Sequence, residues 1–358
     1  MSRLLILICI LISFEVQAQI FQLKVTDYDG LDSINAVKIF IDSEVMKIED
    51  SVNKEFPNET PRRILQGMGD ANIMAAKGIG TDYTSAMQVS VIGATLGAGA
   101  DFEQEKHTKS ETSGYAAAPG LMIGVNLGAL GMNDILNMES DKLNMYVNAM
   151  STKYIQSLDD ENDRTLVGLD MTSIGLHFRY HLVDRSEQHP RWGGLKFTWG
   201  YEYNHSDYTY ETRLDRMINI IGDNELLQGR LTGTPKALVK VRTHSFPLAV
   251  STDYQLLSFL NVYGGTGMDF NIGYAKGIGV ANGDVTPVLC TGGSCGPGRN
   301  LQLQAQANLD ASSLVTPVTV RAFGGFQINV SHLSFYAQVD KEVLTELVSA
   351  AAGIRLFY

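Results

Sequence analysis

Apolar and polar residues alternate with a period of two along much of the chain. The segments 121–129, 174–182, 318–330 and 333–340 show this most clearly, because every second residue is mainly aliphatic or aromatic and those between are mostly polar or small. In a β-strand this period places the two sets on opposite faces, whereas in a helix the polar groups would lie all round the circumference. The pattern therefore predicts strands with one apolar and one polar face.

Weaker alternation fills the intervening sequence at 84–101, 143–156, 193–211, 236–252 and 259–275, and a final strand is expected at 347–358. The total of ten predicts an all-β fold, an antiparallel up-and-down transmembrane β-barrel over residues 83–358 with one face toward lipid. An even number of strands places both ends of the barrel on the periplasmic side. Eight or twelve strands stay possible, because 299–310 also alternates and could extend a strand or form a hairpin.

The predicted connections fall into two classes. The outer loops are 102–113, 157–164, 212–235, 276–315 and the tight 343–346, and the inner connections are 130–142, 183–192, 253–258 and 331–332. The longest loop, 276–315, carries Cys290 and Cys295 close together among glycines. In an exported chain such a pair predicts a local disulfide that fixes a loop tip.

Two uncharged stretches allow a different interpretation, a pair of membrane-spanning helices. Residues 83–100 and 114–133 carry no charge, and Gly120, Gly124 and Gly128 recur every four residues, as in glycine-packed helices. However, proline and many glycines lower the hydropathy of these stretches, and the other alternating segments are too charged to span a membrane as helices. We therefore favour the barrel.

The ends of the chain indicate export. Residues 1–18 have a basic start, a short apolar run and small or aliphatic residues at Val16 and Ala18, which is typical of a signal peptide cleaved after Ala18. The last strand is apolar on one face and ends at Tyr358. It resembles the last strand of Gram-negative outer-membrane β-barrel proteins, which ends in an aromatic residue. That resemblance implies an outer-membrane location, surrounded by outer-membrane lipid and lipopolysaccharide, and recognition by the barrel-assembly machinery.

Residues 19–82 differ from the barrel pattern. Apolar residues recur at spacings of three and four over 32–56, which predicts an amphipathic helix that ends before Pro57. The helix could pack on the rest of the chain or form a short coiled coil in a homo-oligomer. Residues 57–82 read as an irregular linker or plug segment. This layout of helix, plug and barrel resembles the amyloid-secretion porins in architecture alone.

Composition and charge exclude several classes. The chain has 358 residues, 44% of them hydrophobic, and a net charge of −11. This apolar content argues against disorder, and the acidic balance argues against a nucleic-acid partner. The acid is concentrated at the N-terminus, since residues 20–60 hold four Lys and nine Asp or Glu.

Charged and histidine side chains recur at the positions that we assign to the lumen. These are His177, Arg179, His181, Lys196, Glu202, Lys240, Arg242, His244, Arg321, Asp340 and Arg355. Such a lining is mainly basic. It predicts a small or gated pore that favours anionic solutes, or a lumen filled by the acidic N-terminal segment as a plug. The side chains could instead pair with one another and fill a narrow barrel that serves a structural or adhesive role through its loops.

A surface enzyme is the competing class, since ten-stranded barrels resemble the omptin proteases in size. His205, Ser206 and Asp207 lie where an outer rim is expected, but neighbours on a strand point to opposite faces and cannot form a working triad. His177 and His181 share a face without a supporting metal motif. We therefore expect no catalytic site, metal or cofactor.

Overall fold

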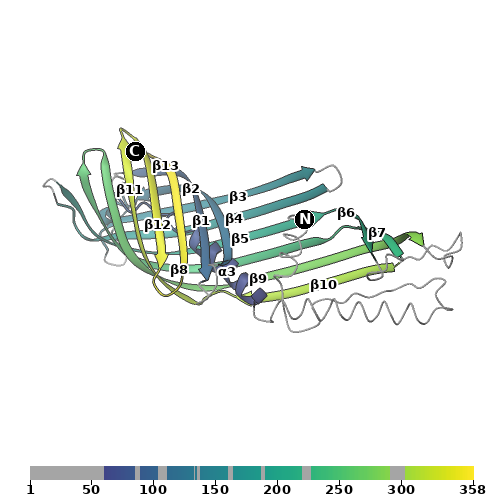
Figure 1. Cartoon of the computed structure of the whole chain (residues 1–358). Coiled ribbons are helices and arrows are strands. Elements are labelled where there is room, and N and C mark those ends of the chain that lie inside the picture. Colours follow the sequence, from purple (N-terminus) through teal and green to yellow (C-terminus); the bar gives the residue numbers. More distant parts are fainter. Residues whose placement is uncertain are drawn as a thin grey trace.

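The computed structural model describes residues 60–84, 89–103, 111–132, 134, 138–159, 164–186, 190–219, 227–290 and 303–358. Within these residues the chain forms one helix, α3 (Thr60–Ala75), followed by one large antiparallel sheet (Figure 1). A single 3-10 turn, η1 (Ser140–Lys142), precedes β3. The expected helix at 32–56 and the signal peptide lie outside the described residues.

Ten strands close this sheet into a ring. Their order is β1 (Ser90–Glu103), β2 (Glu111–Asn126), β3 (Leu143–Asp159), β4 (Arg164–Val183), β5 (Arg191–Thr212), β8 (Lys236–Leu257), β9 (Leu260–Cys290), β11 (Val318–Val330), β12 (Leu333–Glu342) and β13 (Leu347–Phe357). The ring closes where β1 pairs with β13, with Val91 opposite Phe357. The expected ten-stranded β-barrel is confirmed, and both ends of the barrel lie at one side.

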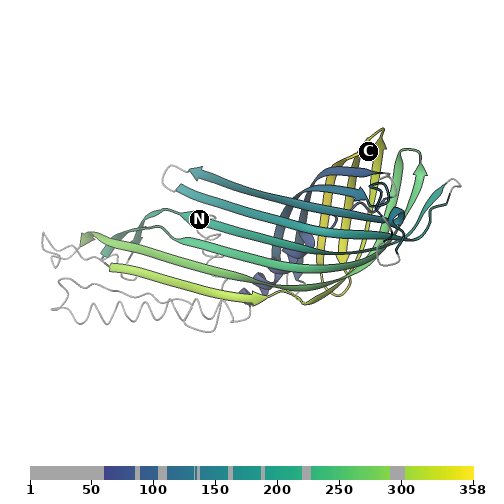
Figure 2. The ribbon, with the colours of Figure 1, turned by 180° about the vertical axis from the view of Figure 1, so that it is seen from behind.

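Three further strands extend the sheet beyond the ring. β6 (Leu214–Asn219) and β7 (Leu227–Gly233) form a hairpin that pairs with the end of β9, and β10 (Leu303–Leu314) pairs with β9 as well. The expected long loops 212–235 and 276–315 therefore contain strands. In Figures 1 and 2, β3, β4, β5, β8, β9 and β10 project well past the short strands β11, β12, β13, β1 and β2.

The barrel is apolar outside and polar inside, as a membrane barrel requires. On β1, for example, Ile92 and Leu96 are exposed, whereas Val91 and Thr95, each directly before one of them, are buried. Buried polar side chains cluster on the inner face of the ring, and large exposed hydrophobic side chains cover its outer face. The alternative of two spanning helices is wrong, because residues 90–103 and 111–126 form the paired strands β1 and β2.

Helix α3 lies against the inner face of the wall, in contact with both β1 and β2 on one side and β8 to β10 on the other. The sequence predicts an irregular linker here, but residues 60–75 are helical. Their pattern is not that of a surface helix, because α3 is surrounded by wall strands and buries polar as well as apolar side chains. In the described part of the chain, no helix is long and apolar enough to cross a membrane.

Candidate functional site

The candidate site is the interface between the barrel wall and residues 60–84, which we call the plug segment. Its helix packs through two apolar clusters. In the first, Leu65 and Met68 contact Val239, Val241 and Ala275 of β8 and β9. The second cluster joins Ala71, Met74, Ala75, Ala76 and Ile79 of the plug segment to Ala116, Ala118 and Leu347 of the wall.

Glycines in the wall make room for this helix. A Cβ atom on Gly97 of β1 would collide with the carbonyl oxygen of Ala75, and one on Gly99 would collide with that of Ala71. A Cβ on Gly114 of β2 would overlap the backbone of Gly67. These three glycines thus allow two strands to approach the helix backbone closely.

Polar side chains of α3 are bound to the wall. The Asp70 carboxylate accepts hydrogen bonds from the backbone N–H of Thr316 at 2.7 Å and from its hydroxyl at 2.6 Å. Asn72 donates to the Ser206 hydroxyl at 2.7 Å and accepts from the Thr243 hydroxyl at 3.0 Å. These contacts fix both the height and the rotation of the helix.

The turn after the helix carries a buried cation, Lys77. Its Nζ lies 2.6 Å from Glu202 Oε2 and 3.3 Å from Asp269 Oδ1, and it donates to the Ser245 hydroxyl at 3.0 Å. All four side chains are buried. Gly78 follows with a φ of +77°, a left-handed conformation that favours glycine, and its carbonyl accepts from the Tyr336 hydroxyl at 3.0 Å.

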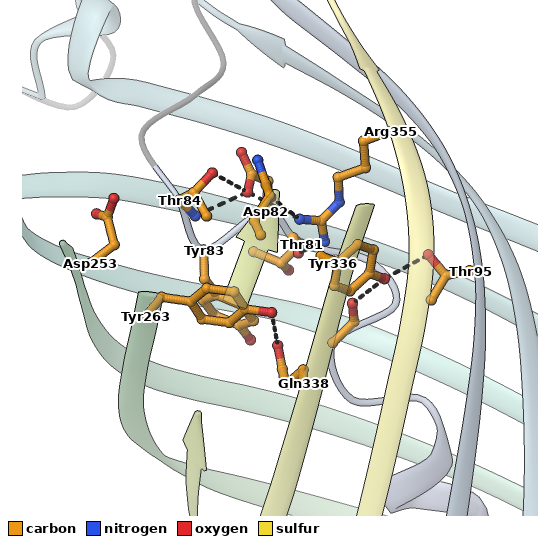
Figure 3. Close-up of polar contacts among 12 residues, drawn as sticks. Thr81, Asp82, Tyr83, Thr84, Thr95, Asp253, Tyr263, Tyr336, Gln338 and Arg355 are labelled. Carbon is orange, nitrogen blue, oxygen red and sulfur yellow. Dashed lines mark hydrogen bonds and ion pairs between the residues drawn. The ribbon is translucent and has the colours of Figure 1, made fainter. Parts of the chain in front are cut away.

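Residues 81–84 lie inside the barrel without forming a helix or strand, and the Asp82 carboxylate is fully buried there (Figure 3). Arg355 of β13 donates to Asp82 Oδ1 at 3.1 Å, to the Thr81 carbonyl at 2.8 Å and to Gln327 at 3.0 Å. The backbone N–H of Thr84 donates to the same Asp82 oxygen at 2.9 Å. A strand arginine thus holds both the side chain and the backbone of the plug segment.

Wall cations also bind the carbonyls of the next two residues. Arg179 donates to the Thr84 carbonyl at 2.8 Å, and Lys196 donates to the Tyr83 carbonyl at 3.0 Å and to Asp253. The Tyr83 ring stacks on Tyr263 with centroids 5.9 Å apart. Both aromatic rings, together with Phe323 and Ala249, form a small apolar cluster among the charges.

The buried charges of the interface are of both signs. Its five cations are Lys77, Arg179, Lys196, Arg321 and Arg355, and its seven carboxylates are Asp70, Asp82, Glu202, Asp253, Asp269, Asp340 and Glu342. Within the wall, Arg321 pairs with Asp269 at 3.0 Å and with Asp340 at 2.6 Å. The buried charges of the described lumen are therefore not mainly basic, in contrast to the basic lining expected from the sequence.

The structure places eight of the eleven expected lumen residues on the inner face. His177, Arg179, Lys196, Glu202, Arg321, Asp340 and Arg355 are buried there, and His181 is half-buried in the same alternating series. It brings Glu202 to the plug segment through Lys77, and Arg355 through Asp82. Nε2 of His177 lies 3.6 Å from Glu202 Oε1.

Lys240, Arg242 and His244 lie on the opposite face of β8. The odd-numbered residues of this strand are the buried ones, including Val239 and Val241, so the even-numbered residues face outward. The inner face of β8 is apolar here because it packs against α3, and this reverses the expected polarity. His244 instead bonds the Tyr201 hydroxyl at 2.8 Å on the outer face.

The arrangement gives little support for catalysis at the sites considered from the sequence. Ser206 points inward to Asn72, whereas His205 bonds the Val241 carbonyl and lies 3.5 Å from Asp207, so the three form no triad. Among the described residues no group of three or more His, Cys, Asp or Glu side chains is placed to hold a metal ion. Cys295 lies outside the described residues, so the Cys290–Cys295 disulfide stays a prediction.

Sequence reasoning missed six charged residues of the interface, Asp70, Lys77, Asp82, Asp253, Asp269 and Glu342. Asp253 was missed because it belongs to the odd-numbered series of β8, which the structure buries, whereas the even-numbered residues were expected inside. Asp269 alternates in the same way with Tyr263 and Gly267 on β9. Lys77 and Asp82 lie in a segment whose position in the lumen has no periodic signal.

One family model and several solved structures match this chain. The family model described as Lsa36-like matches residues 16–358 of this chain. Comparison with curated proteins gives no match. Among solved structures, the transport unit of the autotransporter AIDA-I from Escherichia coli is 11% identical, with a TM-score of 0.34 over 83% of this chain and 99% of that chain.

Two other solved structures are similar at the same level. The translocator domain of the autotransporter NalP from Neisseria meningitidis is 10% identical, with a TM-score of 0.33 over 91% of this chain and 100% of that chain. The toluene transporter TbuX from Ralstonia pickettii is 9% identical, with a TM-score of 0.26 over 82% of this chain and 99% of that chain. Scores this low carry no argument about function.

Proposed function

The chain belongs to the Lsa36-like family, and we propose that it is an outer-membrane β-barrel in which the plug segment gates a passage for small solutes. The observation that best supports this proposal is the chemistry of the interface between the plug segment and the wall. Its centre is held by ion pairs and hydrogen bonds to Lys77, Asp82 and the carbonyls of residues 81–84 rather than by a continuous apolar core.

A gate needs a wall whose buried polar side chains keep ion-pair or hydrogen-bond partners when the plug segment leaves. Arg321 keeps Asp269 and Asp340, Lys196 keeps Asp253, and Arg355 keeps Gln327, because these partners all belong to strands. The buried charges that the segment removes are Lys77, Asp70 and Asp82. Departure of the segment therefore leaves four cations and five carboxylates on the wall. Glu202 loses its ion pair with Lys77, but the wall keeps charges of both signs, which supports a polar lumen that water can enter.

Two engineered disulfides test whether this segment is the gate. A Cβ atom built on Gly69 lies 3.8 Å from Val315 Cβ, and one built on Gly120 lies 3.6 Å from Ile79 Cβ. Both distances suit a disulfide, whose Cβ atoms lie about 3.5–4.5 Å apart. We expect the pairs Gly69→Cys with Val315→Cys and Ile79→Cys with Gly120→Cys to abolish channel openings in planar bilayers when oxidised, and a reductant to restore them.

These variants are made in a chain in which Cys290 and Cys295 are replaced by Ala, so that no other disulfide forms after export. Each single-cysteine variant is the matched control and should conduct equally with and without the reductant. If the oxidised pairs conduct like the reduced ones, the segment is not the gate. If neither the reduced pairs nor the wild-type chain conducts, the solute passage itself is refuted.

A second candidate, a structural or surface-exposed barrel, is favoured by one observation. β3 to β5 and β8 to β10 project far beyond the ring, which presents a large sheet outside the membrane level of the short strands (Figure 1). Deletion of the β6–β7 hairpin separates the two roles. If the chain is only a gated passage, the deletion should change neither the conductance nor the attachment of cells. If the chain has a surface role, attachment should change while the conductance stays the same.

A further inference from the structure

One junction of the ring is much shorter than the others. β2 and β3 pair over six residues, from Leu121 opposite Ala149 to Asn126 opposite Asn144. Each of the other nine junctions pairs over at least nine residues, and β1 remains paired with β2 up to Glu111. The strands β2 and β3 therefore separate above Leu121, and we call this opening the seam.

The seam opens within the membrane. Six paired residues cover roughly 20 Å along the strands at about 3.4 Å per residue. A membrane strand needs about 9–11 residues to cross the hydrocarbon core. The outward side chains of β1 are apolar from Ile92 to Ala98, so the wall beside the upper seam still faces lipid. The seam thus lies in the outer half of the bilayer.

The β2 edge at the seam is adapted to have no partner. The backbone N–H of Asn126 donates to Val89, so the even-numbered residues of β2 bond to β1 and the odd-numbered residues point toward β3. Pro119 therefore directs its nitrogen, which carries no hydrogen, into the seam. This removes one donor from an edge where unpaired peptide groups are costly in lipid.

An apolar pocket of about 590 Å³ crosses this opening. It is lined by Ala98, Tyr115, Ala117 and Ala350 from the short strands, and by Leu169 and Tyr208 from the long strands. Ala98 and Tyr115 are exposed on the outer face of the ring. Leu169 and Tyr208 instead belong to the alternating series of Met171 and Ser206, which face inward. The pocket therefore runs from the lipid-facing side to the inner face.

The plug segment closes the inner end of this pocket. Ala116, another lining residue, packs against Ala71 and Met74 of α3, and Tyr208 packs against Leu65 and Met68. A group that enters through the seam would therefore meet methyl, aliphatic and aromatic surfaces and would end against the helix.

We propose that this pocket binds the acyl chain of an outer-leaflet membrane lipid, which enters sideways through the seam. The lining selects for an apolar group, and the mouth lies among outward-facing side chains in contact with the bilayer. A narrow alkyl chain fits an opening between two strands. The inference depends on the pairing of the wall and holds whether or not the plug segment moves.

Quenching of tryptophan fluorescence by brominated lipid chains tests this proposal. The full-length chain carries Tyr208→Trp as the reporter, with Trp192→Phe and Trp199→Phe to remove its two native tryptophans. In nanodiscs we expect lipids brominated on the acyl chain to quench this reporter, although its position faces inward. Leu169→Trp is a second reporter in case the first variant does not fold.

The matched controls place a phenylalanine on the outer face of the barrel, either within the pocket or away from it. Adding Ala117→Phe should abolish the quenching, whereas Ala94→Phe, also outward-facing but not in the pocket, should leave it unchanged. Absence of quenching in both reporters overturns the proposal, as does an equal loss with Ala94→Phe. Quenching by a free brominated fatty acid but not by brominated lipid would also overturn it, because the ligand would then come from solution.

Discussion

At the scale of single residues, the plug segment depends on a few buried ions whose partners lie hundreds of residues away. Asp82 and Arg355 are both fully buried and share one ion pair at 3.1 Å. Arg355 also lies over the Tyr336 ring, 3.6 Å from its centroid, and Tyr336 in turn bonds the Gly78 carbonyl. One arginine thus links residues 81–82 with the turn at Gly78.

We expect Asp82→Asn to destabilise the closed state strongly. Removing one partner of a buried ion pair leaves an uncompensated charge and costs about 3–5 kcal/mol. Channel openings in planar bilayers should become frequent, and the heat-modifiable gel shift should move to a lower temperature. Glu346→Gln, which removes the partner of Lys341 in an exposed pair, should change neither, since exposed pairs contribute about 0–1 kcal/mol. Equal behaviour of the two variants would contradict the role of Asp82.

At the scale of elements, the backbone of helix α3 packs directly against the glycines of β1. A methyl group on Gly97 cannot coexist with the present position of Ala75, whereas a Cβ on Gly324, in β11, would find its nearest atom, the Tyr263 carbonyl oxygen, 3.7 Å away. Arg63 is exposed but lies within the helix. We expect Gly97→Ala to displace and loosen α3, and so to speed cleavage by trypsin after Arg63 in the folded barrel, because cleavage needs local unfolding of the helix. Gly324→Ala should give the wild-type digestion pattern, and protection of both variants would refute the fit.

The contact between α3 and the wall also shows how far the sequence could predict the structure. Alternation located all ten ring strands because it depends only on a wall with an apolar outside and a polar inside. It failed on β8, where Val239 and Val241 face α3 and the polar Lys240 and Arg242 face outward. Residues 60–84 could not be placed, because their partners, such as Glu202 and Arg355, are set by the closure of the ring and not by local pattern.

At the scale of the whole molecule, net charge and the charge of the lumen are separate quantities. The chain carries −11, but the buried charges of the wall that remains after removal of the plug segment are four cations and five carboxylates, namely Arg179, Lys196, Arg321 and Arg355 against Glu202, Asp253, Asp269, Asp340 and Glu342. Several of these opposite charges lie within ion-pair distance of one another. An ion in the open lumen would therefore experience little net potential from this level of the wall.

We accordingly expect the open state to discriminate weakly between cations and anions. In the reduced Ile79→Cys and Gly120→Cys variant, the reversal potential under a potassium chloride gradient should lie near zero, because rings of one charge sign are what make a pore selective. Replacing Asp253 and Asp269 by Asn should shift the reversal potential toward anion selectivity, since four wall cations would then face three buried carboxylates. Ser251→Asn, an uncharged change on the same inner face, is the control. Strong anion selectivity before these substitutions would mean that carboxylates on the wall do not offset its cations, and it would restore the basic lumen expected from the sequence.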